Sequence, residues 1–245
     1  MEYIGCVNTP EAKTFSKILI LLFLTSLLAA PRTDAQQTIF SIPSSDVLDR
    51  GEVSVEFAAA FKANNERTLR KFSSFVPRLI VGLGKNVELG FAFTGNIQPG
   101  PDAPTLGTGI KWKFYEKQGF SFFAGANFYI PIKHRAYKAG TVSYVGISKS
   151  IGRARFTGGG FVSTRNVFAP NATRSGGIFG FEYTVNKKVG FAADWINGRH
   201  AFGYLTTGLI YKPHSKVSTN FAYAIGNNNA IRGNHYFIVE MAYNF

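Results

Sequence analysis

Cysteine is almost absent from this sequence, and histidine is scarce. The single cysteine, Cys6, stands close to the N-terminus, so the rest of the chain can form neither disulfides nor thiolate metal sites. The four histidines, His134, His200, His214 and His235, include no pair at the i, i+2 or i, i+4 spacing of a metal-binding strand or helix face. The sequence therefore predicts no metal site and no cofactor.

Long hydrophobic runs are missing as well. The one extended apolar run, residues 18–30, is shorter than the about 20 residues that a helix needs to cross a bilayer. Lys13 and Lys17 precede this run, and residues 33–35 (Thr-Asp-Ala) place small side chains where signal peptidase cleaves. Residues 1–35 are therefore predicted to be a cleaved secretory signal peptide, with a retained helical anchor as the weaker alternative. Because no cysteine follows the run, a lipoprotein is excluded.

Acidic residues are few. The chain has 27 lysine and arginine residues against 14 aspartate and glutamate residues, which gives a formal net charge of +13. The basic residues are spread over separate links of a chain predicted to be secreted. This distribution does not indicate a nucleic-acid partner.

What the sequence does contain is a repeated two-residue alternation. From Glu52 onward, segments of about ten residues place apolar side chains on one face and small or charged side chains on the other. Residues 52–245 are therefore predicted to form one β domain of about twelve strands, with ten or fourteen as the limits of the count. The expected strands are 52–61, 75–84, 87–94, 105–115, 120–130, 142–151, 154–163, 177–184, 189–196, 202–211, 216–225 and 237–245.

Two parts of the pattern are less determined. In 142–151 and 154–163, glycines weaken the alternation. The assignment of side chains to the two faces could therefore be shifted by one residue in each strand. Residues 36–51 do not alternate, and they are predicted to form a lead-in at the periplasmic rim. Two arrangements stay open for this lead-in: it tucks into the lumen, or it has no fixed structure.

The last segment ends the chain on an aromatic residue. In Phe237–Phe245, apolar or aromatic side chains, including Tyr243 and Phe245, occupy every second position, and Glu240 falls on the other face. The segment resembles the closing strand of bacterial outer-membrane β-barrel proteins. In that family such a strand carries the signal that the barrel-assembly machinery recognises. The resemblance therefore implies this role for Tyr243 and Phe245, and a location in the bacterial outer membrane.

The apolar face is too extensive for a soluble barrel. It carries large aliphatic and aromatic side chains on nearly every strand, whereas the opposite face is rich in glycine, alanine, serine and threonine. Small polar residues cannot fill a dry core but can line a wet lumen, which argues against a lipocalin-like barrel or a β-sandwich. Short and long links also alternate along the chain, as in outer-membrane barrels with short periplasmic turns. The predicted fold is an all-β, transmembrane, antiparallel up-and-down β-barrel.

Charged residues on the lumen face cluster toward the end of the strands with short turns. Charges inside a membrane barrel need water or a partner, so Glu56 is expected to pair with Arg78. Glu88 is expected to pair with Lys111 or Lys113 on the same grounds. The predicted constriction toward the periplasmic half comprises Glu56, Arg78, Glu88, Lys111, Lys113, Arg155, Glu182, Asp194 and Glu240.

The predicted seam of the barrel brings two acids together. Where the last strand closes against the first, Glu240 would lie beside Glu56, and Arg78 is the base expected between them. Two interpretations of the charged cluster stay open: the selectivity zone of a pore, or a salt-bridged closure that holds the strands together.

The long links carry much of the positive charge. In bacterial outer membranes the outer leaflet contains phosphorylated glycolipid, with which arginine can pair through two hydrogen bonds. Contact with lipopolysaccharide is therefore one hypothesis, and ordinary solvated loop charge is the other. The outer-rim basic residues are Lys62, Arg67, Arg70, Lys71, Lys133, Arg135 and Lys138.

The leading functional prediction is passive diffusion of small solutes through an outer-membrane pore. A non-conducting structural or adhesion barrel that contacts lipopolysaccharide is the alternative. A hydrolase is a minor alternative, because the histidines lie in links or at strand ends and no serine or acidic partner has the spacing of a catalytic set. The chain is accordingly predicted not to be an enzyme, and its oligomeric state stays open.

Overall fold

The computed structural model describes residues 38–62, 72–94, 104–132, 138–228 and 234–245. These residues form a single all-β unit. Among them there is no helix with the length and hydrophobicity that a membrane crossing requires. The expected signal peptide lies outside the described residues, so it stays a prediction.

Twelve antiparallel strands make up the unit. Each expected strand is present, and most bounds differ from the expected ones by only one to three residues. The strands are β1 (Val53–Lys62), β2 (Phe72–Gly84), β3 (Val87–Thr94), β4 (Thr105–Lys117), β5 (Phe120–Pro131), β6 (Gly140–Ile151), β7 (Ala154–Ser163), β8 (Ser175–Thr184), β9 (Val189–Ile196), β10 (Tyr204–His214), β11 (Val217–Gly226) and β12 (His235–Asn244).

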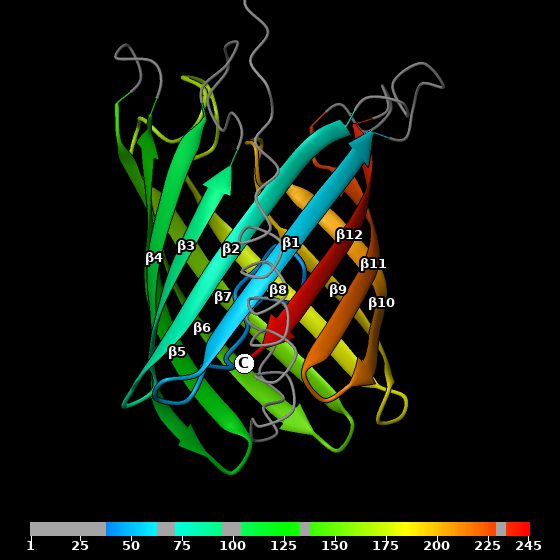
Figure 1. Ribbon diagram of the computed structural model, residues 1–245. Helices are drawn as coiled ribbons and strands as arrows, with labels where there is room; N and C mark the ends of the chain where they lie inside the picture. The colour runs from blue at the N-terminus through cyan, green and yellow to red at the C-terminus, as the bar shows by residue number, and fades with distance from the viewer. Residues whose placement is uncertain (1–37, 63–71, 95–103, 133–137, 229–233) are drawn as a thin grey trace, which may run out of the picture. The chain divides into compact units, whose positions relative to one another are not determined.

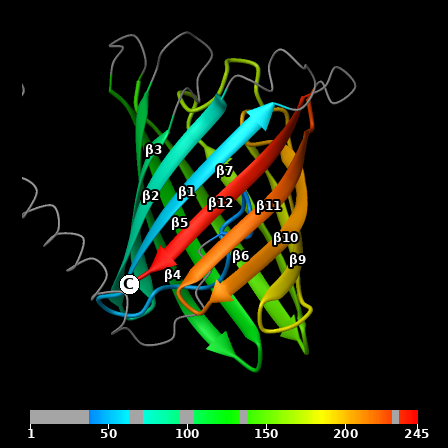
Figure 2. The same ribbon diagram turned by 45° about the vertical axis from the view of Figure 1, so that its right-hand side comes forward.

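The strands close into a barrel in sequence order (Figure 1). Each strand from β2 to β11 pairs with its two neighbours in the chain, and β1 pairs with β12 from Ser54↔Asn244 to Lys62↔Tyr236. Figure 2 shows β12 lying beside β1 at this seam. Closure pairs the backbone polar groups of both terminal strands, which a bilayer demands because it offers them no water. The predicted all-β, antiparallel up-and-down barrel is confirmed.

The outer surface of the barrel is apolar on every strand. Large side chains such as Phe57, Trp112 and Met241 are 46%, 52% and 53% exposed, and a hydrocarbon solvent would cover them. The open face assignments in β6 and β7 are also settled. Val145 and Phe156 point outward, while Val142 and Phe161 are buried inside, and the same alternation holds for their neighbours.

The short turns lie at one rim of the barrel, and the described long links, residues 164–174 and 197–203, lie at the other (Figure 1). At the short-turn rim, Lys85 and Asn86 have φ values of 53° and 59°, the left-handed conformation that a two-residue type I′ hairpin turn requires. Asparagine adopts this conformation more readily than most residues, which explains the tight link between β2 and β3.

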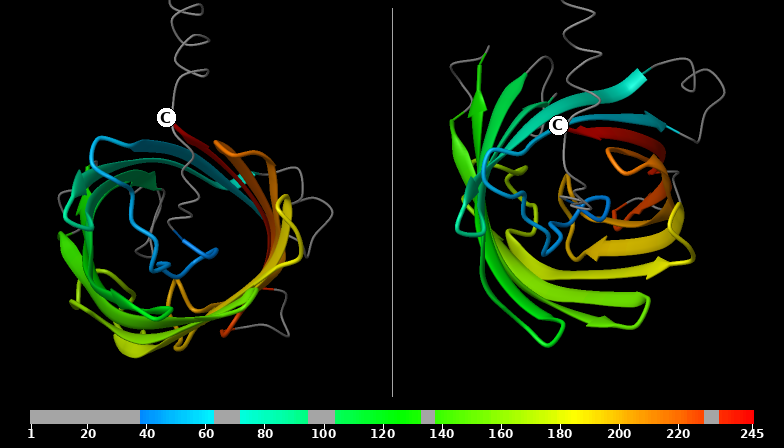
Figure 3. Two further views of the ribbon diagram at one scale, coloured as in Figure 1. Left: turned by 90° about the horizontal axis from the view of Figure 1, so that it is seen from below. Right: turned by 60° about the horizontal axis from the view of Figure 1, so that its bottom comes forward.

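The lumen differs from the small-residue, water-lined interior that the sequence predicted. The segment Thr38–Asp49, here called the luminal segment, lies inside the ring of strands (Figure 3). Ile39 and Ile42 are completely buried, and they pack with Ile178, Ile196 and other inward side chains of β8 to β11. The wall of this half is small or apolar because the segment supplies the volume that fills it. One side of the lumen is therefore dry.

Candidate functional site in the barrel lumen

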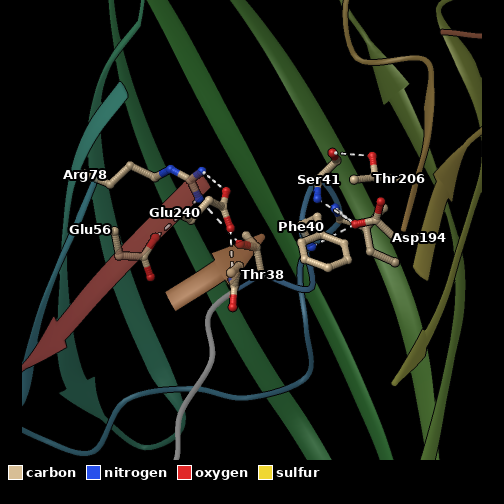
Figure 4. A network of polar contacts seen from close by, with 10 residues as sticks. Thr38, Phe40, Ser41, Glu56, Arg78, Asp194, Thr206 and Glu240 are labelled. Carbon is tan, nitrogen blue, oxygen red and sulfur yellow. Dashed lines mark hydrogen bonds and ion pairs between the residues drawn. The ribbon is translucent and has the colours of Figure 1, made fainter. Parts of the chain in front are cut away.

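Asp194 of β9 is the main polar anchor of the luminal segment. Its Oδ2 atom accepts hydrogen bonds from the backbone N–H groups of Phe40, Ser41 and Ile42, at 2.9, 2.6 and 3.1 Å (Figure 4). The side chain of Ser41 also lies 3.4 Å from the hydroxyl of Thr206 on β10. A hydrogen bond to a charged group contributes about 1.5–3 kcal/mol, so this carboxylate fixes the position of the turn at Phe40.

Arg155 of β7 forms a second anchor. Its guanidinium group binds Asp46 of the luminal segment at 2.7 Å and Glu182 of the neighbouring strand β8 at 2.6 Å. Both acids take two hydrogen bonds from this one group. One cation thus joins the wall to the segment. Its Nε and Nη2 atoms bind Glu182 in the bidentate geometry that favours arginine over lysine, and its Nη1 atom binds both oxygens of Asp46.

Glu88 of β3 forms the third anchor. It pairs with Lys111 of β4 at 2.9 Å and accepts a hydrogen bond from the backbone N–H of Leu48 at 3.1 Å. Both charged side chains are buried, so each needs the other to offset the loss of water.

Arg78 of β2 joins the two acids at the barrel seam. It lies 3.3 Å from Glu56 of β1 and 3.2 Å from Glu240 of β12 (Figure 4). Asn220 of β11 donates a further hydrogen bond to Glu240 at 3.0 Å. A long contact of 3.5 Å connects Arg78 to the hydroxyl of Thr38, at the start of the luminal segment.

Glycines in the wall make room for the segment. A Cβ atom on Gly180 of β8 would collide with the side-chain ends of Ile39 and Ile42. A Cβ atom on Gly82 of β2 would collide with the backbone carbonyl oxygen of Asp49. The wall is therefore shaped to hold this segment in this position.

A cavity of about 900 Å³ occupies the rest of the lumen. Thr38, Phe40, Ser41 and Pro43 of the luminal segment form part of its lining, and so do inward residues of most strands. Residues of the link between β9 and β10, His200 to Phe202, also line it. The cavity thus lies between the luminal segment and the rim with long links.

Aromatic rings gather where the link between β9 and β10 meets the cavity. The ring of His200 stacks on Phe168, with centroids 4.6 Å apart, and meets Phe161 edge-on at 5.1 Å. Phe202 contacts Tyr129 of β5, with centroids 5.8 Å apart. Burial lowers the pKa of His200, so its imidazole is neutral at neutral pH.

The nine residues of the predicted constriction occupy different surroundings. Glu56, Arg78 and Glu240 meet at the seam, and Glu88 meets Lys111. Arg155, Glu182 and Asp194 lie across β7 to β9, where Arg155 and Asp194 hold the luminal segment. Lys113 does not reach Glu88: it pairs with Glu116, three residues later, near the short-turn rim. The ion pairs exist, but their role in selectivity stays a prediction.

The other predicted residues carry less structural information. Tyr243 pairs with Val55 and Val217 near the end of β12, and Phe245 directly follows that strand. Lys62 ends β1 and Lys138 is exposed. The remaining basic positions of the outer rim, Arg67, Arg70, Lys71, Lys133 and Arg135, lie outside the described residues. Lipopolysaccharide contact and recognition by the assembly machinery therefore stay predictions.

The sequence did not single out Asp46, Phe40 or Leu48 as site residues. Their signal was present but weak: residues 39–48 combine five aliphatic or aromatic side chains with hydroxyl residues and a proline, without strand alternation. A lead-in with no packing partner has no need for Ile39, Phe40, Ile42 and Leu48. The composition could have favoured the lumen over an unstructured lead-in.

Nothing in the described part of the chain forms a cluster of three or more histidine, cysteine or acidic residues that could hold a metal ion. Of the histidines with described positions, His200 uses both ring nitrogens locally, toward the carbonyl of Asn197 and the amide of Phe202. These contacts give His200 a structural role in the link.

No family model and no curated protein matches the chain. Solved structures match its fold. The KdgM porin in complex with disordered oligogalacturonate has a TM-score of 0.55 at 10% identity, over 78% of this chain and 99% of that one. A structure of the KdgM porin alone gives 0.53 at 11% identity, with the same coverage. Outer membrane phospholipase A from Escherichia coli gives 0.47 at 11% identity, over 79% of this chain and 92% of that one, a likeness that carries no argument about activity. The chain therefore has the barrel fold of bacterial outer-membrane porins.

Proposed function

We propose that this protein is a passive pore of the bacterial outer membrane for small solutes, and that the luminal segment is its plug. The observation that carries the proposal is the cavity of about 900 Å³ inside the closed barrel, whose floor is a segment held by non-covalent contacts. The fold shared with the KdgM porin supports a pore, and the apolar outer face supports a location in a membrane.

In this proposal the charged constriction and the plug act together. Glu88, Arg155 and Asp194 each bind the luminal segment, so the constriction is complete only while the segment is in place. Solutes cross the inner half of the lumen when the segment moves. Because several charge-assisted hydrogen bonds must break at once, we expect brief and infrequent openings.

The ligand of the structural neighbour is not carried over. Oligogalacturonate is an acidic sugar chain, so a site that binds it needs cationic side chains that are not already paired with acids. Here Arg78 and Lys111 are already paired with acids of the barrel wall. The proposal therefore leaves this solute aside.

Conductance of the refolded protein in planar bilayers tests the proposal. In a Cys6→Ser background, Ser41→Cys with Thr206→Cys places two sulfurs where the hydroxyls are 3.4 Å apart, so that oxidation locks the segment to β10. Asp194→Ala removes the acceptor of three backbone hydrogen bonds and releases the segment. The single variants Ser41→Cys and Thr206→Cys are the matched controls, because neither can form the disulfide that holds the segment to β10.

We expect few conductance steps from the native protein and more frequent steps from Asp194→Ala. The oxidised double-cysteine variant should show no conductance until a reductant is added. A non-conducting structural barrel is the second candidate, favoured by the close packing of the luminal segment. Silence of the native protein and of Asp194→Ala alike, with both correctly folded, would replace the pore by this candidate.

A further inference from the structure

The cavity above the luminal segment has the size and shape of a ligand site. Its volume of about 900 Å³ lies in the upper part of the range that small-molecule sites occupy, roughly 300–1,000 Å³. It lies inside the barrel, so a solute in it contacts wall on several sides. A solute that enters the lumen from the rim with long links would reach this cavity before the luminal segment.

The charged side chains that line this cavity are all engaged in ion pairs. The charged side chains among its described lining residues are Arg78, Lys111, Glu88 and Glu240, two of each sign. All four belong to ion pairs of 3.3 Å or less within the barrel wall. His200 adds no charge at neutral pH, because burial lowers its pKa. A charged solute would lose its water here and find every described counter-charge already paired.

Most of the remaining lining is apolar. Ile80, Val142, Phe161, Ile178 and Ile196 are buried lining residues, and none of them offers a hydrogen bond from its side chain. On β3 and β4, small residues such as Gly90 and Gly107 also line the cavity. Burial of apolar solute surface in the cavity therefore contributes a favourable free energy of about 25 cal/mol for each Å² removed from water.

A few polar side chains can orient a bound solute through hydrogen bonds. The side chains of Asn127, Tyr129, Tyr144 and Tyr204 line the same cavity. Glycines fix two of them against the wall: a Cβ atom on Gly109 would collide with the amide of Asn127, and one on Gly125 with the hydroxyl of Tyr144. A neutral hydroxyl or carbonyl group can exchange hydrogen bonds with such side chains.

We infer that the cavity binds uncharged amphipathic solutes, with an apolar ring or short chain and one or two hydrogen-bonding groups. This inference rests on the proposed pore and names the class of molecule that it admits. The same arrangement disfavours binding of acids and amines of equal size, because the charged side chains of the lining are already paired with each other or with the barrel wall.

Three probes with one skeleton test the class: 4-phenylbutanol, 4-phenylbutanoate and 4-phenylbutylamine, which are neutral, anionic and cationic at pH 7. Binding is measured by calorimetry on the protein in phospholipid nanodiscs, with empty nanodiscs subtracted. The oxidised Ser41→Cys, Thr206→Cys protein is used beside the native one. Binding in the locked protein needs no conduction, so a failed pore and a failed binding site give different results.

Two cavity-filling variants locate the site. A Cβ atom on Gly107 has only ordinary contacts, at 3.6 Å or more, and one on Gly90 has its nearest neighbour at 3.9 Å. Both glycines line the cavity, so the side chains of Gly107→Leu and Gly90→Leu would take up part of its volume. Gly158→Leu is the matched control, because Gly158 pairs with the outward residue Phe179 and its Cβ atom meets nothing within 4 Å. Retained heat-modifiable migration on gels shows that each variant is folded.

We expect the alcohol to bind at least about tenfold more tightly than either ion, and each cavity-filling leucine to weaken it by about tenfold. Gly158→Leu should bind like the native protein. Equal or tighter binding of an ion overturns the inference. So does the absence of binding by the alcohol, or alcohol binding that persists in both folded cavity-filling variants.

Discussion

At the scale of single residues, Arg78 links acids from both strands of the barrel seam. It is the cation between Glu56 and Glu240, which the pairing of the first and last strands brings together. Removal of Arg78 would leave the two partly buried acids facing each other without this cation.

Arg78→Met is therefore expected to lower the free energy of unfolding by about 3 kcal/mol. Adding Glu56→Gln and Glu240→Gln to this variant should restore most of the lost stability, because the two glutamine side chains are neutral amides that do not repel each other. Urea titration of the protein in lipid vesicles, followed by tryptophan fluorescence, measures both. If the triple variant is no more stable than Arg78→Met, the charges do not explain the effect.

His200 makes the link between β9 and β10 sensitive to acid. Its contacts require a neutral ring, in which one nitrogen accepts from the amide of Phe202 at 3.2 Å and the other donates to the carbonyl of Asn197 at 3.0 Å. Burial lowers the folded-state pKa below the ordinary value of 6.5. Between these two values the unfolded link binds more protons, so stability present above 6.5 is lost as the pH falls.

Amide hydrogen exchange of residues 197–203 should therefore become faster at pH 5 than at pH 7.5, after correction for the intrinsic rates. The variant His200→Gln keeps a polar side chain without a titrating group, and it should show no such change. An equal pH response in His200→Gln would assign the effect to another group.

At the scale of elements, the luminal segment and the wall of β8 fit each other. The absence of a side chain on Gly180 lets Ile39 and Ile42 reach the wall. Overfilling a packed core costs about 1–3 kcal/mol, and here the strain falls on the luminal segment, which is not part of the barrel ladder.

Gly180→Leu is expected to displace the luminal segment while leaving the strands paired. The amides of Phe40, Ser41 and Ile42 should lose protection in hydrogen exchange, and channel openings should become more frequent. Gly158→Leu, on the outer face of the neighbouring strand, is the control and should change neither. Full protection of these amides in Gly180→Leu would mean that the wall does not position the segment.

At the scale of the whole molecule, the fold depends on closure between strands about 180 residues apart in the sequence, β1 and β12. In this register Ala59 stands opposite Val239, while the next residue, Ile238, stands opposite Ala60. A shift of one residue turns a side chain from the lipid face to the lumen.

In a Cys6→Ser background, Ala59→Cys with Val239→Cys should form a disulfide on oxidation, seen as a change in migration of the boiled protein on a gel. Ala59→Cys with Ile238→Cys should not cross-link, because the two side chains point to opposite faces. Efficient cross-linking of the second pair instead of the first would show a different register at the seam.

Much of this fold could be predicted because it depends on local pattern. Alternation along β1 to β5 and β8 to β12 identified the strands, and the weaker pattern of β6 and β7 left only the facing undecided. The pairs Glu56–Arg78 and Glu88–Lys111 followed from neighbouring strands in a known order. Lys113 departs from the expected pairing because Glu116, close by in the same strand, offers a nearer partner.

The sequence by itself determined the class of fold, the number of strands and the face of most residues, because side chains in a strand alternate at every second position. Only the tertiary structure decided what fills the lumen. Residues 38–49 have no periodicity that predicts their place, and their contacts with Glu88, Arg155 and Asp194 join positions 40 to 154 residues apart. Such contacts arise from closure of the barrel, which brings distant inward side chains around one short segment.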